Sequence, residues 1–583
     1  MTATTDSRQR GPLLAWASTI VFFGALAAAN AIRVAPGGPA GDVEHLEAGV
    51  LGLALFVLWV AVFGRVWPAV LSAFLLVAWW WPAELLLRHQ YGTPVAPQFV
   101  GLALDSNWPE LVELVFLMGP EALLGLALFM LVTVPALVLT RRYPVRWSHR
   151  SRWWFLAAFP LAAGAMHTVF QSQEPDWLKP MQDPFRVEPL AFWPNKWRSV
   201  FPLTLPLALV RFQEDAERVS RMRQHIAGFK FGAATAQAPL DTVVLVIGES
   251  SRADRWSLNG YARKTNPALE KRQNLVFLSN VITPSIATRY AVPFLLSRRP
   301  VLLADGQLNP RPEPSLVVAF AEAGYRSTWI STQSPTGFWD STTAFYARDA
   351  QTVKFMNPAA MEHHGAYDEV LVEPLAALLR TPRPQLVVVH TMGSHFNYAN
   401  RYPPAFDRFQ PSLKTKAVDA GAGKHALEIG NSYDNTILYT DHVLDRLIAQ
   451  LEQHGGRSVL AFVSDHGEDL ESPGCPAASL KREGRWSYRV PALVWMSDAL
   501  VRDQPGMLAR LRLRSADPLQ TDALMPTLLE MAGVRIPDDG VGGHPGLLAA
   551  TPTARPRMVM GADNEWTDFD AAERREPCRI GSR

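Results

Sequence analysis

Cysteine is nearly absent from this sequence, and the shortage limits the sites that the chain can build. Only two cysteines, Cys475 and Cys578, occur among 583 residues. They are too few for a disulfide framework or for a zinc site built mainly from cysteine. The two can form a single disulfide in an oxidising compartment, and the sequence leaves their pairing open.

A strong net charge is lacking as well. The formal net charge is +2 at pH 7, and so small a charge does not indicate nucleic-acid binding. Hydrophobic residues make up 48% of the chain and charged residues only 19%, a mixture too apolar in places for a purely soluble enzyme. The length exceeds what one hydrophobic core supports, so at least two structural units are expected.

Long apolar runs are absent from most of the chain, and nearly all of them lie before residue 175. Five uncharged windows each approach the ~20 residues that a helix needs to cross a hydrocarbon core of about 30 Å. The windows are 11–32, 48–64, 66–83, 122–140 and 153–173. They predict five membrane-spanning helices, and the alternative is a group of buried helices in a large soluble protein.

The arginines around these windows predict an orientation. Arg8 and Arg10 precede the first window, Arg65 separates the second from the third, and further arginines between 141 and 152 precede the fifth. The positive-inside rule places these segments in the cytoplasm. Because the number of spans is odd, everything after residue 174 is expected outside the cytoplasm.

The chain is thus expected to have three parts. Residues 1–174 form a transmembrane domain, 175–240 an interfacial linker with a short amphipathic helix near 212–229, and 241–583 a periplasmic globular domain. Tryptophans alternate with lysine and arginine in the linker, and such rings suit the headgroup layer of a membrane. An ordinary linker is the alternative.

Short apolar runs alternate with amphipathic stretches after residue 241. The runs are TVVLVIG, STWIST, QLVVVHT, SVLAFVS and VPALVWM, and they are continuous, as in strands that are covered on both faces. Stretches such as EVLVEPLAALLR and DALMPTLLEMAGV read as helices. The pattern predicts an α/β domain with a mostly parallel sheet flanked by helices. In such folds ligands bind at the carboxyl ends of the strands.

Polar clusters follow three of these predicted strands. They are, in chain order, Glu249 after the first, His390 with His395 in HTMGSH at the third, and Asp465 with His466 in SDHGE at the fourth. Carboxylates and imidazoles that converge from several strand ends are the ligands that zinc requires, at about 2.0–2.2 Å. One such segment alone would be read as a turn, but three together predict a metal site.

Six segments, taken in order, resemble the motifs of the membrane-bound phosphoethanolamine transferases. They are VIGESSRADRWSLNGYARKTNP, FLSNVITPSIATRYAVP, HTMGSHFNYANRYP, NSYDNTILYTDHVLDRL, VSDHGE and VPALVWM. This family includes lipid A modifying enzymes and belongs to the alkaline-phosphatase-like sulfatase superfamily. Five leading spans before one periplasmic domain also match, so the resemblance covers nearly the whole chain. It implies a sulfatase-like catalytic domain over 241–583.

The resemblance implies a catalytic zinc site in this domain. Glu249, Thr288, Asp465 and His466 take the positions of the zinc ligands, and Thr288 is also the nucleophile. A divalent cation stabilises an alkoxide much as it lowers the pKa of bound water from about 15.7 toward ~7. Taken without the resemblance, Thr288 would be an ordinary threonine at the start of a helix.

Other polar residues of the motifs have expected roles too. Ser250 and Ser251 are expected to hydrogen-bond or cap the turn, because GESSR lacks the glycine two residues past the nucleophile that a hydrolase elbow needs. His395 resembles a group that contacts phosphate or acts as acid and base, and His390 is a second candidate. Each histidine has the alternative of a strand-end side chain bonded to the backbone.

The resemblance also implies the reaction and its partners. Phosphatidylethanolamine gives phosphoethanolamine to Thr288 and diacylglycerol leaves; a cell-envelope glycolipid or glycan then accepts the group, with ping-pong kinetics. The loop 91–115 is similar to the family loop that holds the ethanolamine head. Ser106 and Glu110 take its hydroxyl and acidic positions, and Glu110 is expected to pair with the ammonium. A plain solvated acid is the alternative.

Departures from the family pattern bear on the acceptor and the metal count. The segment DLESPGCPAASLKREGRW has no histidine where the lipid A enzymes have one, and Leu102 replaces the asparagine of the outer loop. One zinc site is therefore expected, and a second stays open. The departures favour an acceptor such as a lipopolysaccharide core sugar or a periplasmic glucan over lipid A phosphate. The C-x-P-S-R segment that sulfatases modify is absent.

Two other functions stand as alternatives at this point. A phosphoglycerol transferase of the same superfamily uses a donor with the same phosphodiester and the same leaving diacylglycerol. A non-catalytic membrane-anchored protein would bind lipid or glycan, but it would not need an activated hydroxyl at Thr288. The acceptor and the oligomeric state stay open.

Overall fold

The computed structural model describes most of the chain. The described residues are 3–31, 39–91, 94–95, 100, 119–173, 197, 200–235, 239–301, 309–333, 341–356, 366–415, 425–470, 484–538, 546–549, 555–560, 566–578 and 580. The chain divides into two compact units, Met1–Met181 with Val187–Glu214 and Glu362–His364, and Gln182–Arg186 with Asp215–Met361 and Gly365–Arg583. We call them the helical unit and the α/β unit.

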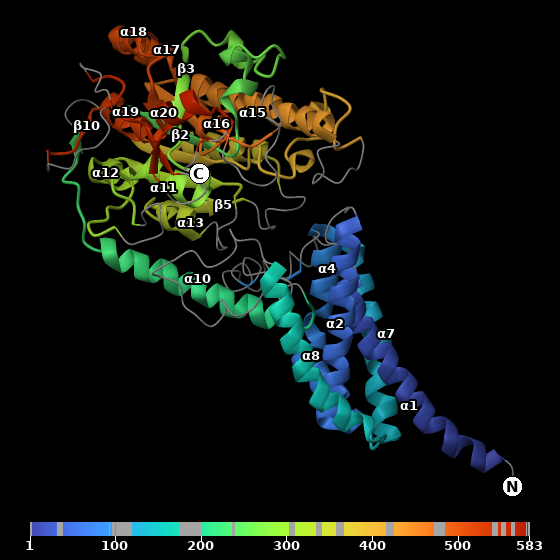
Figure 1. The fold of residues 1–583 in the computed structure, drawn as a ribbon. Helices are drawn as coiled ribbons and strands as arrows, with labels where there is room; N and C mark the ends of the chain where they lie inside the picture. Colours follow the sequence, from blue (N-terminus) through green and yellow to red (C-terminus); the bar gives the residue numbers. More distant parts are fainter. Residues whose placement is uncertain are drawn as a thin grey trace. The chain divides into compact units, whose positions relative to one another are not determined.

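The helical unit is built from long, largely apolar helices (Figure 1). They are α1 (Ala3–Ala28), α2 (Pro39–Phe63), α3 (Val66–Leu76), α4 (Trp81–Tyr91), α7 (Gly119–Arg142) and α8 (Ser151–Gln173). Buried rings such as Phe22, Phe56 and Phe129 belong to the apolar cluster that holds them together. A further helix, α10 (Thr204–Ile226), begins in this unit and overlaps the segment where a short amphipathic helix was expected.

The described residues contain two helices that are long and apolar enough to cross a membrane. They cover Arg10–Ala31 and Leu124–Arg142, with mean hydropathies of 1.8 and 2.0. Val66–Leu76 and Ala78–Leu85 make a third if this pair, bent by 48°, is one span, and Ala48–Phe63 is a shorter apolar helix. The bend fits the sequence, because Pro82 has no backbone N–H for the preceding turn. The structure thus supports two or three spans by this measure, where five were expected.

The α/β unit contains an eight-stranded sheet in the order β5-β4-β6-β2-β7-β8-β3-β9. The strands are β2 (Thr242–Gly248), β3 (Leu275–Ile282), β4 (Arg326–Ser331), β5 (Thr352–Phe355), β6 (Gln385–His390), β7 (Ser458–Ser464), β8 (Arg489–Met496) and β9 (Leu519–Gln520). Only β8 runs antiparallel to its neighbours, β7 and β3. The expected α/β domain with a mostly parallel sheet is confirmed, as a mixed sheet with one reversed strand.

Helices cover both faces of this sheet (Figure 1). One face packs on α11 (Thr288–Leu296), α12 (Leu316–Glu322), α13 (Ser341–Ala347), α18 (Pro505–Leu513) and α19 (Leu524–Met531), and the other on α14 (Val372–Leu379) and α15 (Ala426–His454). Along β2, Val243 and Leu245 enter the first core and Val244 and Val246 the second. This division explains why the strand reads as one continuous apolar run.

Smaller elements complete the unit. They are α16 (Arg485–Tyr488), α17 (Asp498–Asp503), α20 (Phe569–Arg575), the pair β1 (Ala234–Thr235) and β10 (Val534–Arg535), and the pair β11 (Met558–Met560) and β12 (Trp566–Asp568). Near the end of the chain Cys578 is disulfide-bonded. Cys475, the other cysteine of the sequence, lies outside the described residues.

Candidate metal centre

The register of three neighbouring strands brings polar residues to one edge of the sheet. Ile247 of β2 pairs with His390 of β6 on one side and with Val463 of β7 on the other. Because these strands are parallel, Glu249 and Asp465, each just past its strand, emerge next to each other. Adjacent parallel strands therefore place side chains that are more than 200 residues apart in the sequence at one site.

Glu249, Asp465 and His466 form a group that can hold a metal ion. Each offers one ligand atom, and these atoms all lie within 4.8 Å of one another. The Nε2 atom of His466 lies 3.4 Å from Oε1 of Glu249 and 3.5 Å from Oδ2 of Asp465. The other ring nitrogen, Nδ1, lies 2.6 Å from the carbonyl oxygen of Gly467. A proton on Nδ1 satisfies that carbonyl and leaves the Nε2 lone pair for a metal.

Thr288 places its hydroxyl in the middle of this group. Its Oγ1 donates to Oδ2 of Asp465 at 2.6 Å, and lies 3.2 Å from Oε2 of Glu249 and 3.3 Å from Nε2 of His466. Thr288 is half-buried and is the first residue of α11. The first backbone N–H groups of a helix have no acceptor within the helix, so they favour an anion such as phosphate.

The electrostatics of the group suit a cation. Burial, followed by the charge of Asp465, raises the pKa of Glu249 to about 8, and burial raises the pKa of Asp465 to about 6. Two carboxylates that share a buried site repel each other, and a divalent cation between them would offset both the repulsion and the desolvation. The donor set of two carboxylate oxygens, one imidazole nitrogen and one hydroxyl fits zinc.

The two serines after Glu249 organise the turn. Ser250 has a φ of 55°, a region that residues other than glycine seldom adopt. Its N–H donates to Oδ1 of Asp465 at 3.1 Å and its hydroxyl to Oε1 of Glu249 at 2.7 Å. Ser251 accepts from the indole N–H of Trp256 at 2.9 Å. Both serines thus make the hydrogen bonds that were expected of them.

Gln333 is a site residue that the sequence reasoning missed. Its Nε2 donates to Oε2 of Glu249 at 3.2 Å and to the carbonyl oxygen of Thr391 at 2.9 Å. The residue lies two positions after the end of β4, at the same edge of the sheet as the three polar clusters. The sequence does hold a signal for Gln333, because this polar residue comes directly after STWIST, one of the predicted strands.

Asp368 is a second missed residue, and it holds the loop after β6. Its carboxylate accepts from the hydroxyl of Thr332 at 2.5 Å and from the N–H groups of Met392 and Gly393 at 2.8 and 2.9 Å. Gly393 has a φ of +47°, and a Cβ there would lie 2.8 Å from the carbonyl oxygen of Glu249. The loop therefore rests directly on the backbone of Glu249, and only glycine fits the contact.

The structure places the two predicted histidines outside the metal-binding group. His390 is buried with its ring edge-on to Trp329 at 5.7 Å, and burial lowers its pKa to about 3, so it is neutral. His395 is half-buried, and its Nδ1 lies 2.5 Å from the carbonyl oxygen of Phe396. The catalytic roles of both stay predictions. Ser106 and Glu110 lie outside the described residues.

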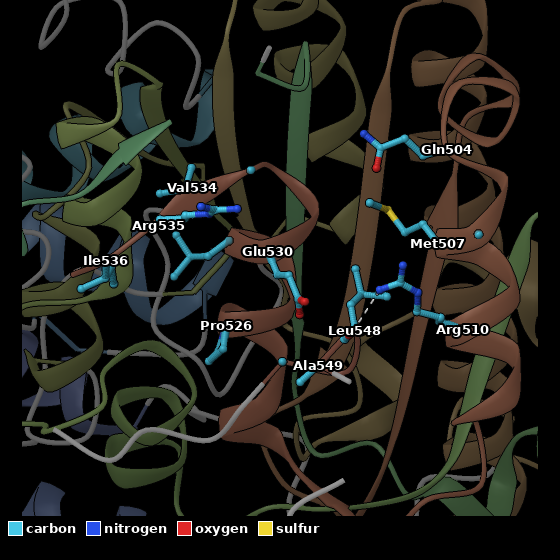
Figure 2. Close-up of a pocket in the computed structure, with 14 residues that line it drawn as sticks. Gln504, Met507, Arg510, Pro526, Glu530, Val534, Arg535, Ile536, Leu548 and Ala549 are labelled. Atoms are coloured by element: carbon cyan, nitrogen blue, oxygen red, sulfur yellow. Dashed lines mark hydrogen bonds between the residues drawn. The ribbon is translucent and has the colours of Figure 1, made fainter. Parts of the chain in front are cut away.

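A cavity of about 700 Å³ lies between α18 and α19, away from the metal-binding group. Figure 2 shows Arg510 and Glu530 entering it from the two helices. Arg510 donates to the carbonyl oxygen of Leu548 at 3.3 Å, and burial raises the pKa of Glu530. None of the predicted site residues that the structure describes lines this cavity. The chemistry of the side chains, and not the size of a cavity, identifies the candidate site.

Comparison with known proteins adds relatives with named activities. The chain is 31% identical over 269 residues to phosphoethanolamine transferase EptC of Escherichia coli K12, covering 44% of this chain and 45% of the relative. It is 31% identical over 340 residues to EptA of the same organism, covering 56% and 57%. It is 29% identical over 369 residues to the Kdo(2)-lipid A phosphoethanolamine 7''-transferase, covering 60% and 61%. The chain spans about half the length of these curated relatives.

A solved structure shares the fold of the α/β unit. The C-terminal periplasmic domain of EptC from Escherichia coli, in complex with zinc, matches with 27% sequence identity and a TM-score of 0.50. The match covers 58% of this chain and 95% of that domain. The sulfatase family matches residues 241–534. Because that match extends over half of the chain, this protein belongs to the sulfatase family.

Proposed function

We propose that this protein transfers phosphoethanolamine from phosphatidylethanolamine to a cell-envelope glycolipid or glycan, by way of a phosphothreonine at Thr288. The observation that carries the proposal is the position of Thr288 Oγ1, 2.6 Å from Asp465 and within 3.3 Å of both other members of the group. A hydroxyl surrounded by metal-binding side chains has the activation that nucleophilic catalysis needs. The names of the curated relatives support this reaction class.

Zinc is the proposed cofactor, held by Glu249, Asp465 and His466 at one site, with Thr288 as the fourth ligand. The donor types fit a catalytic zinc site, and the related EptC domain was solved in complex with zinc. When bound, zinc supplies positive charge that lowers the pKa of the Thr288 hydroxyl and offsets the charge on the phosphoryl oxygens.

The first half of the reaction transfers the group to the protein. Thr288 Oγ1 releases its proton to solvent and attacks the phosphorus of phosphatidylethanolamine. The bond from phosphorus to the diacylglycerol oxygen breaks, and His395 is the proposed donor of the proton that this oxygen takes. The N–H groups at the start of α11 face the phosphate.

The second half regenerates the enzyme. A hydroxyl of the acceptor attacks the phosphorus and gives its proton to His395, while the bond from Oγ1 to phosphorus breaks and Oγ1 takes a proton from solvent. Ser106 and Glu110 are proposed to hold the ethanolamine head, with Glu110 paired to the ammonium. His390 is a second proposed acid–base group, but its ring packs on Trp329.

The proposal includes a location in the bacterial inner membrane. Five spans within residues 1–174, an interfacial segment at 175–240 and a periplasmic catalytic domain at 241–583 form the proposed organisation. The apolar helices of the helical unit support a membrane anchor. The disulfide at Cys578 supports an oxidising compartment for the α/β unit, because disulfides persist in the periplasm and are rare in the cytosol.

Mass spectrometry of the full chain tests the function. The purified protein is incubated with phosphatidylethanolamine or phosphatidylglycerol, and the peptide that contains Thr288 is weighed. The proposal expects the added mass of phosphoethanolamine on Thr288, and no adduct in Thr288→Ala. An adduct of phosphoglycerol in its place would assign the chain to the phosphoglycerol transferases. If zinc-loaded protein forms no adduct with either lipid, the proposal is overturned, and a non-catalytic protein that binds lipid or glycan is the remaining alternative.

A further inference from the structure

A narrow apolar groove in the helical unit belongs to no part of the proposed transfer site. Most of its lining residues belong to α1 and α2, and its volume is about 340 Å³, within the ~300–1,000 Å³ range of ligand sites. Phe23, Phe56 and Val60 line it and are almost fully buried. Trp147, from the segment that follows α7, also lines it. The groove is a formed feature of the packed helices.

The lining of the groove suits hydrocarbon. Among its polar side chains, Thr19 donates its hydroxyl to the carbonyl oxygen of Ala15 at 2.7 Å, and Trp147 donates its indole N–H to Ser151 Oγ at 3.0 Å. These polar atoms are engaged within the protein, so they offer little to a sugar or a peptide. A lipid acyl chain has the chemistry that this lining accepts.

The neighbourhood of Trp147 is strongly basic. Its backbone N–H donates to the carbonyl oxygen of Gly64 at 3.0 Å, and Arg65 and Arg146 form a β-bridge. Both arginines are exposed. Across 48–83 and 122–173 the sequence has no Asp or Glu and six arginines, which are Arg65, Arg141, Arg142, Arg146, Arg150 and Arg152. The segment that contributes Trp147 to the groove is therefore rich in arginine, and α1, the other helix at this end, carries Asp6 together with Arg8 and Arg10 in its first turns.

We propose that this groove binds an anionic phospholipid of the surrounding membrane. An acyl chain lies between α1 and α2, and the phosphate lies among the arginines next to Trp147. Hydrocarbon packing alone does not select one lipid, because lipid tails are as apolar as leucine. The arginines provide the selection, as basic pockets between membrane helices do for anionic head groups.

This site is distinct from that of the proposed donor lipid. The positive-inside rule places the arginines on the cytoplasmic side, whereas the donor is proposed to reach the catalytic unit from the periplasmic side. The inference rests on the membrane location in the proposed function, but it does not rest on the transfer reaction. A protein without transferase activity would still show the lipid preference.

Gly24 allows the groove to be filled by substitution. It lines the groove, and a Cβ built on it meets no heavy atom within 4 Å. Gly24→Phe therefore adds a ring on the groove side, from a position where the first side-chain atom meets no neighbour, and phenylalanine is tolerated better than glycine inside a helix. Gly164 of α8 also has no heavy atom within 4 Å of a built Cβ and lies outside the groove. Gly164→Phe is thus the matched control.

Native mass spectrometry of the full chain in detergent measures the bound lipid. Phosphatidylglycerol and phosphatidylcholine with the same acyl chains are the two probes. We expect one phosphatidylglycerol to bind roughly tenfold or more tightly than phosphatidylcholine, since each arginine near the head group contributes about 1 kcal/mol. Gly24→Phe is expected to lose this lipid and Gly164→Phe to keep it. Arg65→Gln with Arg146→Gln is expected to lower phosphatidylglycerol binding to the phosphatidylcholine level.

Several outcomes would overturn the inference. Equal binding of the two lipids by the unaltered chain would show that the arginines do not select the lipid. Undiminished phosphatidylglycerol binding by Gly24→Phe would show that the lipid does not lie in the groove. If Gly24→Phe instead converts a dimer to a monomer in the same spectra, the occupant is a second copy of the chain. If Gly24→Phe does not fold, the double arginine variant decides alone, and unchanged preference in it refutes the site.

Discussion

The Glu249 carboxylate is held by Gln333, a residue outside the family motifs, and single substitutions can measure how much this contact contributes to zinc affinity. Gln333 donates to Glu249 Oε2 at 3.2 Å, so Gln333→Leu removes a bond to the carboxylate at nearly constant volume. Groups that orient a metal ligand typically contribute 10–100-fold to metal affinity. We expect a loss of about that size in zinc affinity, measured by calorimetry. Gln385→Leu, at the other end of the sheet with a bond to Thr242, is the control and should leave zinc affinity unchanged.

Asp441 is expected to give stability a pH dependence of its own. Burial raises its pKa to about 7, although it accepts from the backbone N–H groups of Ala268 and Leu269. An acid whose pKa is raised by folding keeps its proton longer in the folded chain, so the free energy of unfolding falls as pH rises from about 4 to about 7. Asp441→Asn removes this part of the dependence. The free energy of unfolding in urea is measured for both chains, and the value for the variant minus that for the unaltered chain should be larger at pH 8 than at pH 5. A difference that is the same at both pH values would contradict the raised pKa of Asp441.

At the scale of an element, the loop after β6 is held in place by one carboxylate. Asp368 accepts two backbone N–H groups and one hydroxyl, and the loop it holds supports Glu249 through the N–H of Ser394 at 2.9 Å. In Asp368→Asn an amide NH₂ must face at least one of those N–H groups, which costs about 1–3 kcal/mol. We expect lower stability together with a zinc affinity reduced by roughly 10–100-fold.

A control separates positioning from general destabilisation. Asp349 is another buried carboxylate and accepts from the N–H of Ser315 at 2.7 Å, with Arg223 as its ion-pair partner. Asp349→Asn should lower the unfolding temperature without changing zinc affinity. Equal effects of the two substitutions on zinc affinity would show that Asp368 acts through stability alone.

For the whole molecule, the expected consequence of the metal site is a stability that depends on zinc. A ligand that binds only the folded state adds about 2.7 kcal/mol at a concentration of 100 Kd, so a chelator should lower the unfolding temperature of the α/β unit. Glu249→Gln should abolish this zinc-induced shift. Without zinc and at a pH above 8, where Glu249 is ionised, the same variant should unfold at a temperature no lower than that of the unaltered chain, because it removes one of two buried carboxylates that repel each other. A lower temperature would show that the pair is stabilising without metal.

Strand ends were a reliable guide to part of the site, because the position of a polar residue after an apolar run is visible in the sequence. Glu249, Asp465 and His466 were found in that way, and Thr288 was found only through the resemblance of its segment to a family motif. Gln333 could have been found, since it follows a recognised strand. Asp368 could not, because its partners at 392 and 393 lie beyond an intervening helix and strand. His390 was placed correctly on its strand, but the direction of its ring depends on packing against Trp329.

Local patterns in the chain are sufficient to class each segment, with apolar helices first and then buried strands with polar ends, because hydrophobic periodicity and strand length are local properties. Only the folded chain shows the order of the strands and the reversed direction of β8. The same is true of the close approach of Glu249, Asp465 and His466, whose ligand atoms lie within 4.8 Å of one another. Those features follow from how non-adjacent strands pair and which faces they bury. Hydrogen bonds and packing between residues hundreds of positions apart leave no periodic signal in the chain, so only the folded arrangement shows how the side chains of the site meet.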